Sequence, residues 1–238
     1  MDHLTLKTIL KNMGNDEQAA LLQRFFKTGK GEYGEGDKFY GVKVPQIRLI
    51  EKTHSPLSLH TIEQLLADEY HECRMLGALA LVSLFKHSKK DPLQRKTIYD
   101  FYISHADRIN NWDLTDLSAP WIVGGYLLDK PREDLLRFAQ SDLLWLQRIA
   151  MVGTQHWIKK GDFEYTFLVA KQLLHHPHDL IHKAVGWMLR EIGNTDLAAE
   201  RSFLDKKKRY KSMPRTMLRY AIEKFPEPLR QKYLKGEI

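Results

Sequence analysis

Apolar residues recur at intervals of three and four along most of this 238-residue chain, and that period constrains the fold more than any other feature. Side chains with this spacing share one face of an α-helix, whereas a half-buried strand requires strict alternation. No stretch alternates for long enough to require a strand. We therefore predict an all-α protein. The predicted helices cover residues 3–12, 16–27, 45–53, 59–68, 70–87, 92–107, 112–127, 132–140, 142–158, 162–174, 179–193, 196–206, 214–224 and 226–234.

A weak repeat accompanies these helices. Basic residues separated by 74, 35 and 36 positions each precede small or apolar residues: Arg74, Arg148, Lys183 and Arg219. A period of this length with two helices per repeat is typical of HEAT-like α-solenoids, in which stacked helix pairs contact mainly their neighbours. We predict a HEAT-like α-α superhelix with a concave basic face, formed by residues 1–238 as a single domain. The alternative is a non-repetitive helical array with coincidental spacing.

The excess positive charge lies near the C-terminus. Residues 181–238 contain fourteen Lys and Arg against seven Asp and Glu, and this difference of +7 equals the net charge of the whole chain. Such a distribution indicates a surface that binds a polyanion. A solvated basic segment is the alternative. The run Lys206, Lys207 and Lys208 fits both readings, and we favour contact with phosphates.

Composition excludes several classes of protein. Hydrophobic residues make up 43% of the chain and charged residues 28%, which is typical of a globular protein. No apolar run approaches the ~18 residues that cross a bilayer, and the N-terminus lacks a signal-peptide pattern. The single cysteine, Cys73, allows neither an intramolecular disulfide nor a cysteine-based zinc site. We expect a cytoplasmic protein that does not associate with membranes.

Two further patterns are poor evidence for a ligand site. Residues 29–34 match GxGxxG, but they follow a predicted helix instead of a strand, which favours a loop over a dinucleotide site. Four histidines flank Pro177 without companion carboxylates, which favours an interhelical turn over a metal site. These histidines are His175, His176, His178 and His182. We expect neither a metal ion nor a cofactor.

Two predicted helices place unusual residues opposite their apolar stripe. In the helix at 179–193, Lys183, Trp187 and Arg190 share the polar face, although a tryptophan normally lies on the buried side. In the helix at 142–158, Arg148 faces away from the stripe. We expect these four side chains to face away from the core.

The helix that begins near Trp112 has the same character. Its expected core stripe consists of Leu114, Leu117, Ser118, Trp121 and Ile122, with Pro120 as a disturbance. Trp112 and Asp116, four residues apart, share the opposite face. Adjacent repeats would bring these groups and those of the two later helices onto one concave wall. The alternative is that another helical layer buries both tryptophans and that Asp116 forms a structural salt bridge with Arg148.

Three segments of the chain resemble a known family. They read NNWDLTD at 110–116, DLLWLQR at 142–148 and IHKAVGWMLR at 181–190, and a further similar stretch, GEYGEGDKFYGVKVP, runs from 31 to 45. These segments resemble the AlkD-like DNA alkylation repair glycosylases, and the similarity extends to about residue 224. The resemblance implies a monofunctional glycosylase that removes positively charged N3- or N7-alkylated purines from double-stranded DNA. The implied partner is double-stranded DNA carrying alkylated bases, and no obligate protein partner is evident.

The resemblance also implies roles for individual residues. Asp116 matches the active-site carboxylate, and Trp112 and Trp187 match the two aromatic residues that flank the deoxyribose of the lesion. Arg148 matches a basic residue near the lesion-bearing backbone. The chain departs from the type member of this family at two positions. The type member has a second tryptophan where this chain has Asn111, and a tyrosine where this chain has Phe25.

The implied chemistry suits these residue types. A positively charged alkylpurine leaves as a neutral base without a general acid, so the enzyme must mainly stabilise the sugar cation. One carboxylate, Asp116, can do so and can also orient the attacking water. Aromatic faces favour nearby positive charge, and cations such as Lys183 and Arg190 can hold phosphates. Two alternatives stay open: a non-catalytic HEAT-like protein that binds damaged, bent or branched DNA, and a protein-binding scaffold anchored by its tryptophans.

Overall fold

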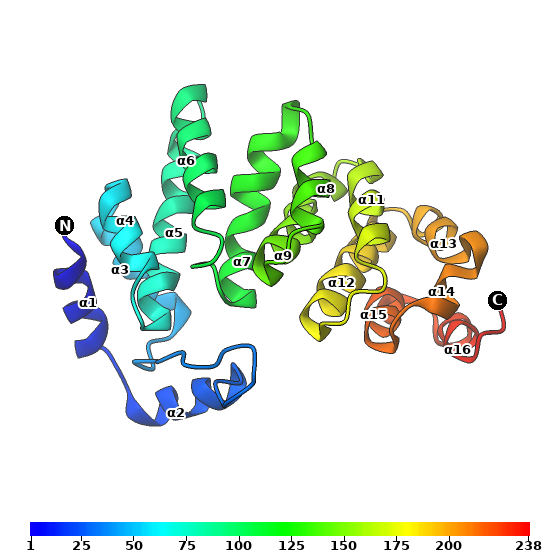
Figure 1. Ribbon diagram of the computed structural model, residues 1–238, viewed down its shortest axis with the longest axis horizontal. Coiled ribbons are helices and arrows are strands. Elements are labelled where there is room, and N and C mark those ends of the chain that lie inside the picture. The colour runs from blue at the N-terminus through cyan, green and yellow to red at the C-terminus, as the bar shows by residue number, and fades with distance from the viewer. The chain divides into compact units, whose positions relative to one another are not determined.

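The computed structural model describes residues 1–238 and is all-α, as the periodicity predicts (Figure 1). One isolated bridge between Lys38 and Tyr70 is the extent of β-pairing, so no sheet forms. The chain divides into two compact units, an N-terminal unit of Met1–Ile122 and a C-terminal unit of Val123–Ile238. The single HEAT-like domain stays a prediction.

The N-terminal unit contains seven α-helices. They are α1 (His3–Asn12), α2 (Asp16–Phe25), α3 (Val44–His54), α4 (Leu59–Leu66), α5 (His71–His87), α6 (Pro92–Ser104) and α7 (Trp112–Ala119). The side chains of Asn15 and Asp91 accept backbone hydrogen bonds from Gln18 and Gln94, at 2.8 and 2.9 Å, and so cap α2 and α6.

Helix α5 forms the centre of the N-terminal unit. It packs against α3, α4, α6 and α7, which surround it in Figure 1. Its sequence is apolar on every side from Met75 to Val82, and all of these residues are buried. A helix without a polar face belongs in the middle of a core. The polar residues in its first turns, which include Glu72 and Arg74, are also buried.

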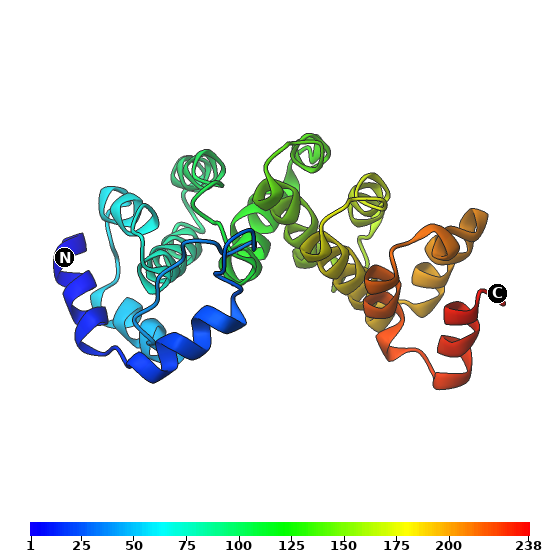
Figure 2. The same ribbon diagram turned by 60° about the horizontal axis from the view of Figure 1, so that its bottom comes forward.

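Helix α2 contrasts with α5, because none of its residues is buried. Its apolar side chains Leu21 and Phe25 are 52% and 63% exposed. The loop that follows α2 passes the start of α7 (Figure 2).

The predicted helix at 112–127 changes its geometry in the middle. After α7 the chain forms a π-helical turn at Pro120–Gly124. Proline has no N–H to donate within the helix, and a π turn shifts the direction of the following side chains. Trp121 is therefore 45% exposed, with the ammonium of Lys86 3.5 Å from its ring centroid. The prediction that Trp121 belongs to the core stripe is wrong.

The C-terminal unit contains the remaining helices. They are η2 (Leu127–Asp129), α8 (Glu133–Ala139), α9 (Leu144–Gly153), α10 (Gln155–Ile158), α11 (Glu164–Gln172), α12 (Asp179–Thr195), α13 (Leu197–Asp205), η3 (Lys206–Lys208), α14 (Arg209–Ser212), α15 (Arg215–Ala221), η4 (Ile222–Lys224) and α16 (Glu227–Lys235). The predicted helix at 142–158 is thus divided at Thr154. Helix α12 packs against α9, α11, α13 and α15. Gly186 permits the close approach of α15, since a Cβ there would lie 2.5 Å from the Met217 carbonyl oxygen.

None of the helices combines the length and the apolar character that a membrane crossing requires.

Candidate functional site

Trp112 is the first residue of α7. The side chain of Asn111 caps the helix and accepts a hydrogen bond from the Trp112 backbone N–H at 2.8 Å. The indole Nε1 of Trp112 donates to the Tyr33 hydroxyl at 3.2 Å, and the ring is half-buried. The indole is therefore held at its edge while part of it stays open to solvent.

Two phenylalanines from the end of α2 contact this indole. Phe26 stacks on Trp112 with ring centroids 5.4 Å apart and an interplanar angle of 26°. Phe25 meets the same ring nearly edge-on at 5.9 Å. The predicted site residues Phe25 and Trp112 thus lie together. Sequence reasoning missed Phe26, although its place beside Phe25 was a possible signal.

Asp116 lies one turn after Trp112 on α7 and is half-buried. It lies near Tyr102 of α6, whose hydroxyl bonds with the Ser118 hydroxyl at 2.8 Å. Burial raises the pKa of the Tyr102 phenol, and the negative charge of Asp116 adds to that rise. The carboxylate therefore lies beside a phenol that stays neutral.

Asp113 does not cap the helix, because Asn111 holds that position. The Asp113 carboxylate instead lies 2.9 Å from Nε2 of His71, which is buried at the start of α5. A helix that begins at Trp112 places Asp113 in its first turn, within reach of α5.

A buried polar cluster continues from His71. Asp37 Oδ1 accepts a hydrogen bond from Arg74 at 2.5 Å, and Asp37 Oδ2 accepts one from Asn111 at 3.2 Å. Arg74 also donates to the Asp68 carbonyl oxygen at 2.9 Å. Burial opposes ionisation of Asp37, but His71 and Arg74 hold the pKa of Asp37 below its ordinary value. Asp37 is one of three acidic residues in the segment GEYGEGDKF, and nothing in that segment marks it as the buried one.

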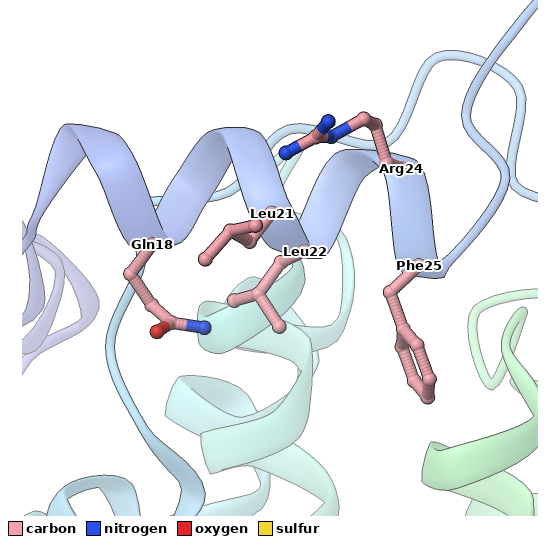
Figure 3. A pocket seen from close by; sticks show the side chains of 5 residues that line it. All are labelled: Gln18, Leu21, Leu22, Arg24 and Phe25. Carbon is pink, nitrogen blue, oxygen red and sulfur yellow. The ribbon is translucent and has the colours of Figure 1, made fainter.

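Two of the cavities that adjoin α2 in this unit are lined in part by Phe25. One of about 390 Å³ is mainly apolar, and its lining includes Phe25, Phe26, Phe39, His71, Trp112 and Asp113. The other, of about 580 Å³, is lined by Gln18, Leu21, Leu22, Arg24 and Phe25. Figure 3 shows Gln18, Leu22 and Phe25 projecting from one side of α2, with Arg24 directed elsewhere.

In the C-terminal unit, Arg148 differs from expectation. It does not face away from the core but is buried, with 4% of its surface exposed. Its Nη1 donates to the Leu180 carbonyl oxygen in the first turn of α12, at 2.6 Å. The helical projection correctly placed Arg148 on the side of the helix opposite its apolar stripe. It could not show that α12 packs against that side and buries the side chain.

The face predicted for α12 is confirmed. Lys183, Trp187 and Arg190 are half-buried, whereas the residues of the apolar stripe are buried: Leu180, Ile181, Ala184, Val185, Met188 and Leu189.

The polar groups on this face have acidic neighbours. Lys183 pairs with Asp179 at 2.7 Å, and Trp187 Nε1 donates to Glu191 at 3.1 Å. Arg190 pairs with Glu191 at 3.4 Å and also with Glu223. A phosphate that binds Arg190 must therefore compete with two carboxylates.

The remaining predicted residues lie at loops of the same unit. Lys206, Lys207 and Lys208 are exposed in η3, and Lys207 and Lys208 have positive φ of 56° and 51°. His175, His176 and His178 lie in the turn between α11 and α12, and His182 lies near the start of α12. There, His178 Nδ1 accepts a hydrogen bond from the Leu180 N–H at 3.1 Å, which agrees with the predicted turn.

Each unit thus gathers part of the predicted site. The N-terminal unit combines Phe25, Trp112 and Asp116, an aromatic surface next to a carboxylate. The C-terminal unit joins Arg148 to the helix that carries Lys183 and Trp187. Aromatic faces favour cations, and a carboxylate stabilises positive charge that develops nearby.

The chain is similar to a known protein family and to a solved structure. A family model described as DNA alkylation repair enzyme matches residues 6–225. A solved structure titled "Predicted DNA alkylation repair enzyme from Enterococcus faecalis" is similar with a TM-score of 0.70 and 15% sequence identity. The match covers 90% of this chain and 98% of that one, and at this identity it shows the fold alone. No curated protein matches the chain.

Proposed function

The chain belongs to the DNA alkylation repair enzyme family and thus acts in the repair of alkylation damage, and on this premise we propose that it is a DNA glycosylase. Its substrates are positively charged N3- and N7-alkylated purines in double-stranded DNA, and its product is an abasic site. It needs no lyase activity and no cofactor for this reaction.

The observation that carries the proposal is that α7 holds Trp112 and Asp116 four residues apart, and therefore on the same side of the helix. Trp112 is stacked on Phe26, so its ring is held in place before any substrate binds. The negative potential of the indole face favours an alkylpurine cation and the sugar cation that replaces it. Asp116 supplies the full negative charge that the sugar cation needs.

The reaction has one bond to break and one to form. The bond between C1′ and the base nitrogen breaks, and its electron pair goes to the base, which leaves neutral. Water then adds to C1′ while its proton passes to Asp116, which acts as a base and orients the water. No acid is required for the leaving group, so a single carboxylate suffices.

The C-terminal unit supplies the second aromatic residue and the phosphate contacts. Trp187 is proposed to contact the deoxyribose, and Lys183 and Arg148 to hold the backbone near the lesion. Arg190 and the exposed Lys206, Lys207 and Lys208 are proposed as further phosphate contacts.

The two departures from the family pattern have structural consequences. Asn111 caps α7 and donates to Asp37, so it holds the helix and contributes no aromatic face. Phe25 keeps the aromatic contact with Trp112 but has no hydroxyl.

The test is release of modified bases from methylated duplex DNA under single-turnover conditions. We expect 7-methylguanine and 3-methyladenine to be released as free bases, with abasic sites formed in equal amount. Unmodified guanine is the control substrate, and it should stay in the duplex because it carries no positive charge. Tight binding without release of any base would contradict the glycosylase and favour the non-catalytic DNA-binding alternative.

A further inference from the structure

The residues on both sides of Trp112 are tied to one buried pair of side chains. Asn111 Nδ2 donates to Asp37 Oδ2 at 3.2 Å, and Asp113 Oδ2 lies 2.9 Å from His71 Nε2. Asp37 and His71 in turn contact each other, with Oδ2 and Nδ1 3.4 Å apart. That distance fits an ion pair better than a hydrogen bond, and Nδ1 has no closer partner.

The charges of this cluster balance only in one protonation state. Asp37 and Asp113 are negative and Arg74 is positive, so neutrality requires a protonated His71. The neighbouring carboxylate of Glu72 accepts hydrogen bonds from the backbone N–H groups of residues 40–42, at 2.8–3.2 Å. Loss of the His71 proton would leave uncompensated negative charge in a buried place, which is costly.

Aromatic stacking extends the cluster to Trp112. The His71 ring lies 4.8 Å from the Phe39 ring and 4.9 Å from the Phe26 ring. Phe26 then stacks on Trp112 at 5.4 Å. His71 is thereby linked to Trp112 in two ways, through Asp113 along the chain and through Phe26 across the rings.

From these contacts we propose that His71 and Asp37 are positioning residues that fix the first turn of α7. They hold Asn111 and Asp113, and so set the orientation of Trp112 and of Asp116 one turn later. The inference rests on the proposed function for its effect on base release, but the orientation of Trp112 can be measured without it.

The pH range over which His71 keeps its charge follows from the groups that surround it. Burial alone would lower the pKa of His71, but the carboxylates of Asp113 and Asp37 outweigh burial and raise it to about 9. The folded pKa thus exceeds the ordinary value of 6.5. The positioning contacts are complete at neutral pH and are lost as the pH rises through about 9.

The test uses His71→Gln, which keeps a hydrogen-bonding side chain but removes the charge. His105→Gln is the matched control, because His105 caps the C-terminus of α6 and its charged neighbour is the exposed Glu63, at 3.4 Å, while its Nδ1 lies 2.8 Å from the Phe101 carbonyl oxygen. We measure the pH dependence of the Trp112 indole N–H resonance, assigned with Trp112→Phe, and of single-turnover base release. Binding to undamaged duplex and thermal melting are recorded beside them.

In the unmodified protein we expect the indole resonance to titrate near pH 9 and base release to fall over the same range. His71→Gln should release bases roughly ten- to a hundredfold more slowly, as misplaced catalytic groups do. It should also lose the alkaline titration of Trp112 while binding undamaged DNA as before. Asp37→Asn, which keeps the size and one of the two acceptor oxygens but removes the negative charge, serves if His71→Gln does not fold, and it should lower the midpoint of the titration.

The outcomes separate this inference from the proposed function. An indole resonance that titrates near pH 9 only while His71 is present supports the positioning role, even if no base is released at all. In that case the glycosylase proposal fails alone. A Trp112 resonance that is indifferent to pH, or that titrates equally in His71→Gln, overturns the positioning role whatever the activity.

Discussion

The indole nitrogen of Trp112 donates a hydrogen bond to the Tyr33 hydroxyl 79 positions earlier in the chain, across 3.2 Å. Tyr33 lies in the loop that follows α2. Two carboxylates of this loop accept hydrogen bonds from backbone N–H groups of the same loop. Glu32 accepts a hydrogen bond from the Gly29 N–H at 2.9 Å, and Glu35 accepts one from Gly31 at 2.7 Å. The GxGxxG stretch is therefore a loop that closes on itself and holds an aromatic residue of the candidate site.

Trp112→Ala and Trp187→Ala should each reduce base release more than they reduce binding to undamaged DNA. Aromatic–cation contacts contribute about 0.5–2 kcal/mol and act where positive charge is present. Single-turnover rates on methylated duplex, compared with affinity for unmodified duplex, measure the difference. Both indoles are half-buried, so melting temperatures must accompany these measurements. Equal losses on the two kinds of DNA would indicate general docking or packing roles.

Replacement of Lys206, Lys207 and Lys208 by alanine should weaken the salt dependence of duplex binding. These side chains are exposed at the end of α13. Each phosphate contact that is lost should reduce the slope of log K against log salt by about 0.9. Lys89 and Lys90, exposed after α5, are the matched control. If replacing Lys89 and Lys90 changes the slope as much per lysine as replacing Lys206, Lys207 and Lys208, the effect reflects net charge, and the basic contact has been assigned to the wrong residues.

Glu200→Gln should stabilise the protein at neutral and alkaline pH. Glu200 is 1% exposed, and its Oε1 has no hydrogen-bond partner. Burial raises its pKa from 4.5 to about 9, although Arg190 opposes the rise. The folded state thus binds a proton that the unfolded state releases, so this group lowers the free energy of unfolding as pH rises from 4.5 to about 9.

The amide cannot ionise, so the melting temperature of Glu200→Gln should depend less on pH. We expect a gain in stability near pH 8, because folding requires Glu200 to take up a proton at this pH, whereas the amide takes up none. Glu164→Gln, at an exposed position in α11, should change nothing. If the melting temperatures of Glu200→Gln and of the unmodified protein change equally with pH between 4.5 and about 9, the raised pKa of Glu200 is contradicted.

The sequence predicted the parts of the fold that depend on local pattern. The apolar stripe of α12 has a regular period, so its buried face and the half-buried Lys183, Trp187 and Arg190 could be predicted. Trp121 could not be placed, because the π turn at Pro120–Gly124 changes the angle between successive residues.

Tertiary partners were beyond the reach of a helical projection. Arg148 was expected to face away from the core, but its side chain reaches the Leu180 carbonyl oxygen of a helix that begins 31 positions later. The cluster of Asp37, His71 and Asp113 joins a loop, α5 and α7, and nothing in the local sequence of any one of them specifies the other two. Likewise, the sequence alone could not show the role of Asn111, which stands where the type member of the family has a tryptophan. The structure shows that Asn111 donates a hydrogen bond to Asp37.

Asp116→Asn should abolish or greatly slow base release and leave the fold and the DNA affinity nearly unchanged. The substitution keeps the size and removes the negative charge that a sugar cation needs. Loss of one well-placed transition-state contact costs on the order of 3–4 kcal/mol, or about 10²–10³ in rate. Binding should be equal or slightly tighter, because a carboxylate near phosphates is repulsive in the ground state.

Two other aspartates separate this catalytic role from structural ones. Asp113→Asn breaks the contact with His71 and should lower the melting temperature together with the rate, because His71 is left as a buried charge with one partner fewer. Asp100→Asn, on the exposed side of α6, should affect neither. Single-turnover release on methylated duplex and a melting curve for each variant give the comparison. If Asp116→Asn lowers the melting temperature and DNA affinity in step with the rate, Asp116 is a structural ion-pair partner; full activity in Asp116→Asn would mean that the reaction does not depend on this carboxylate.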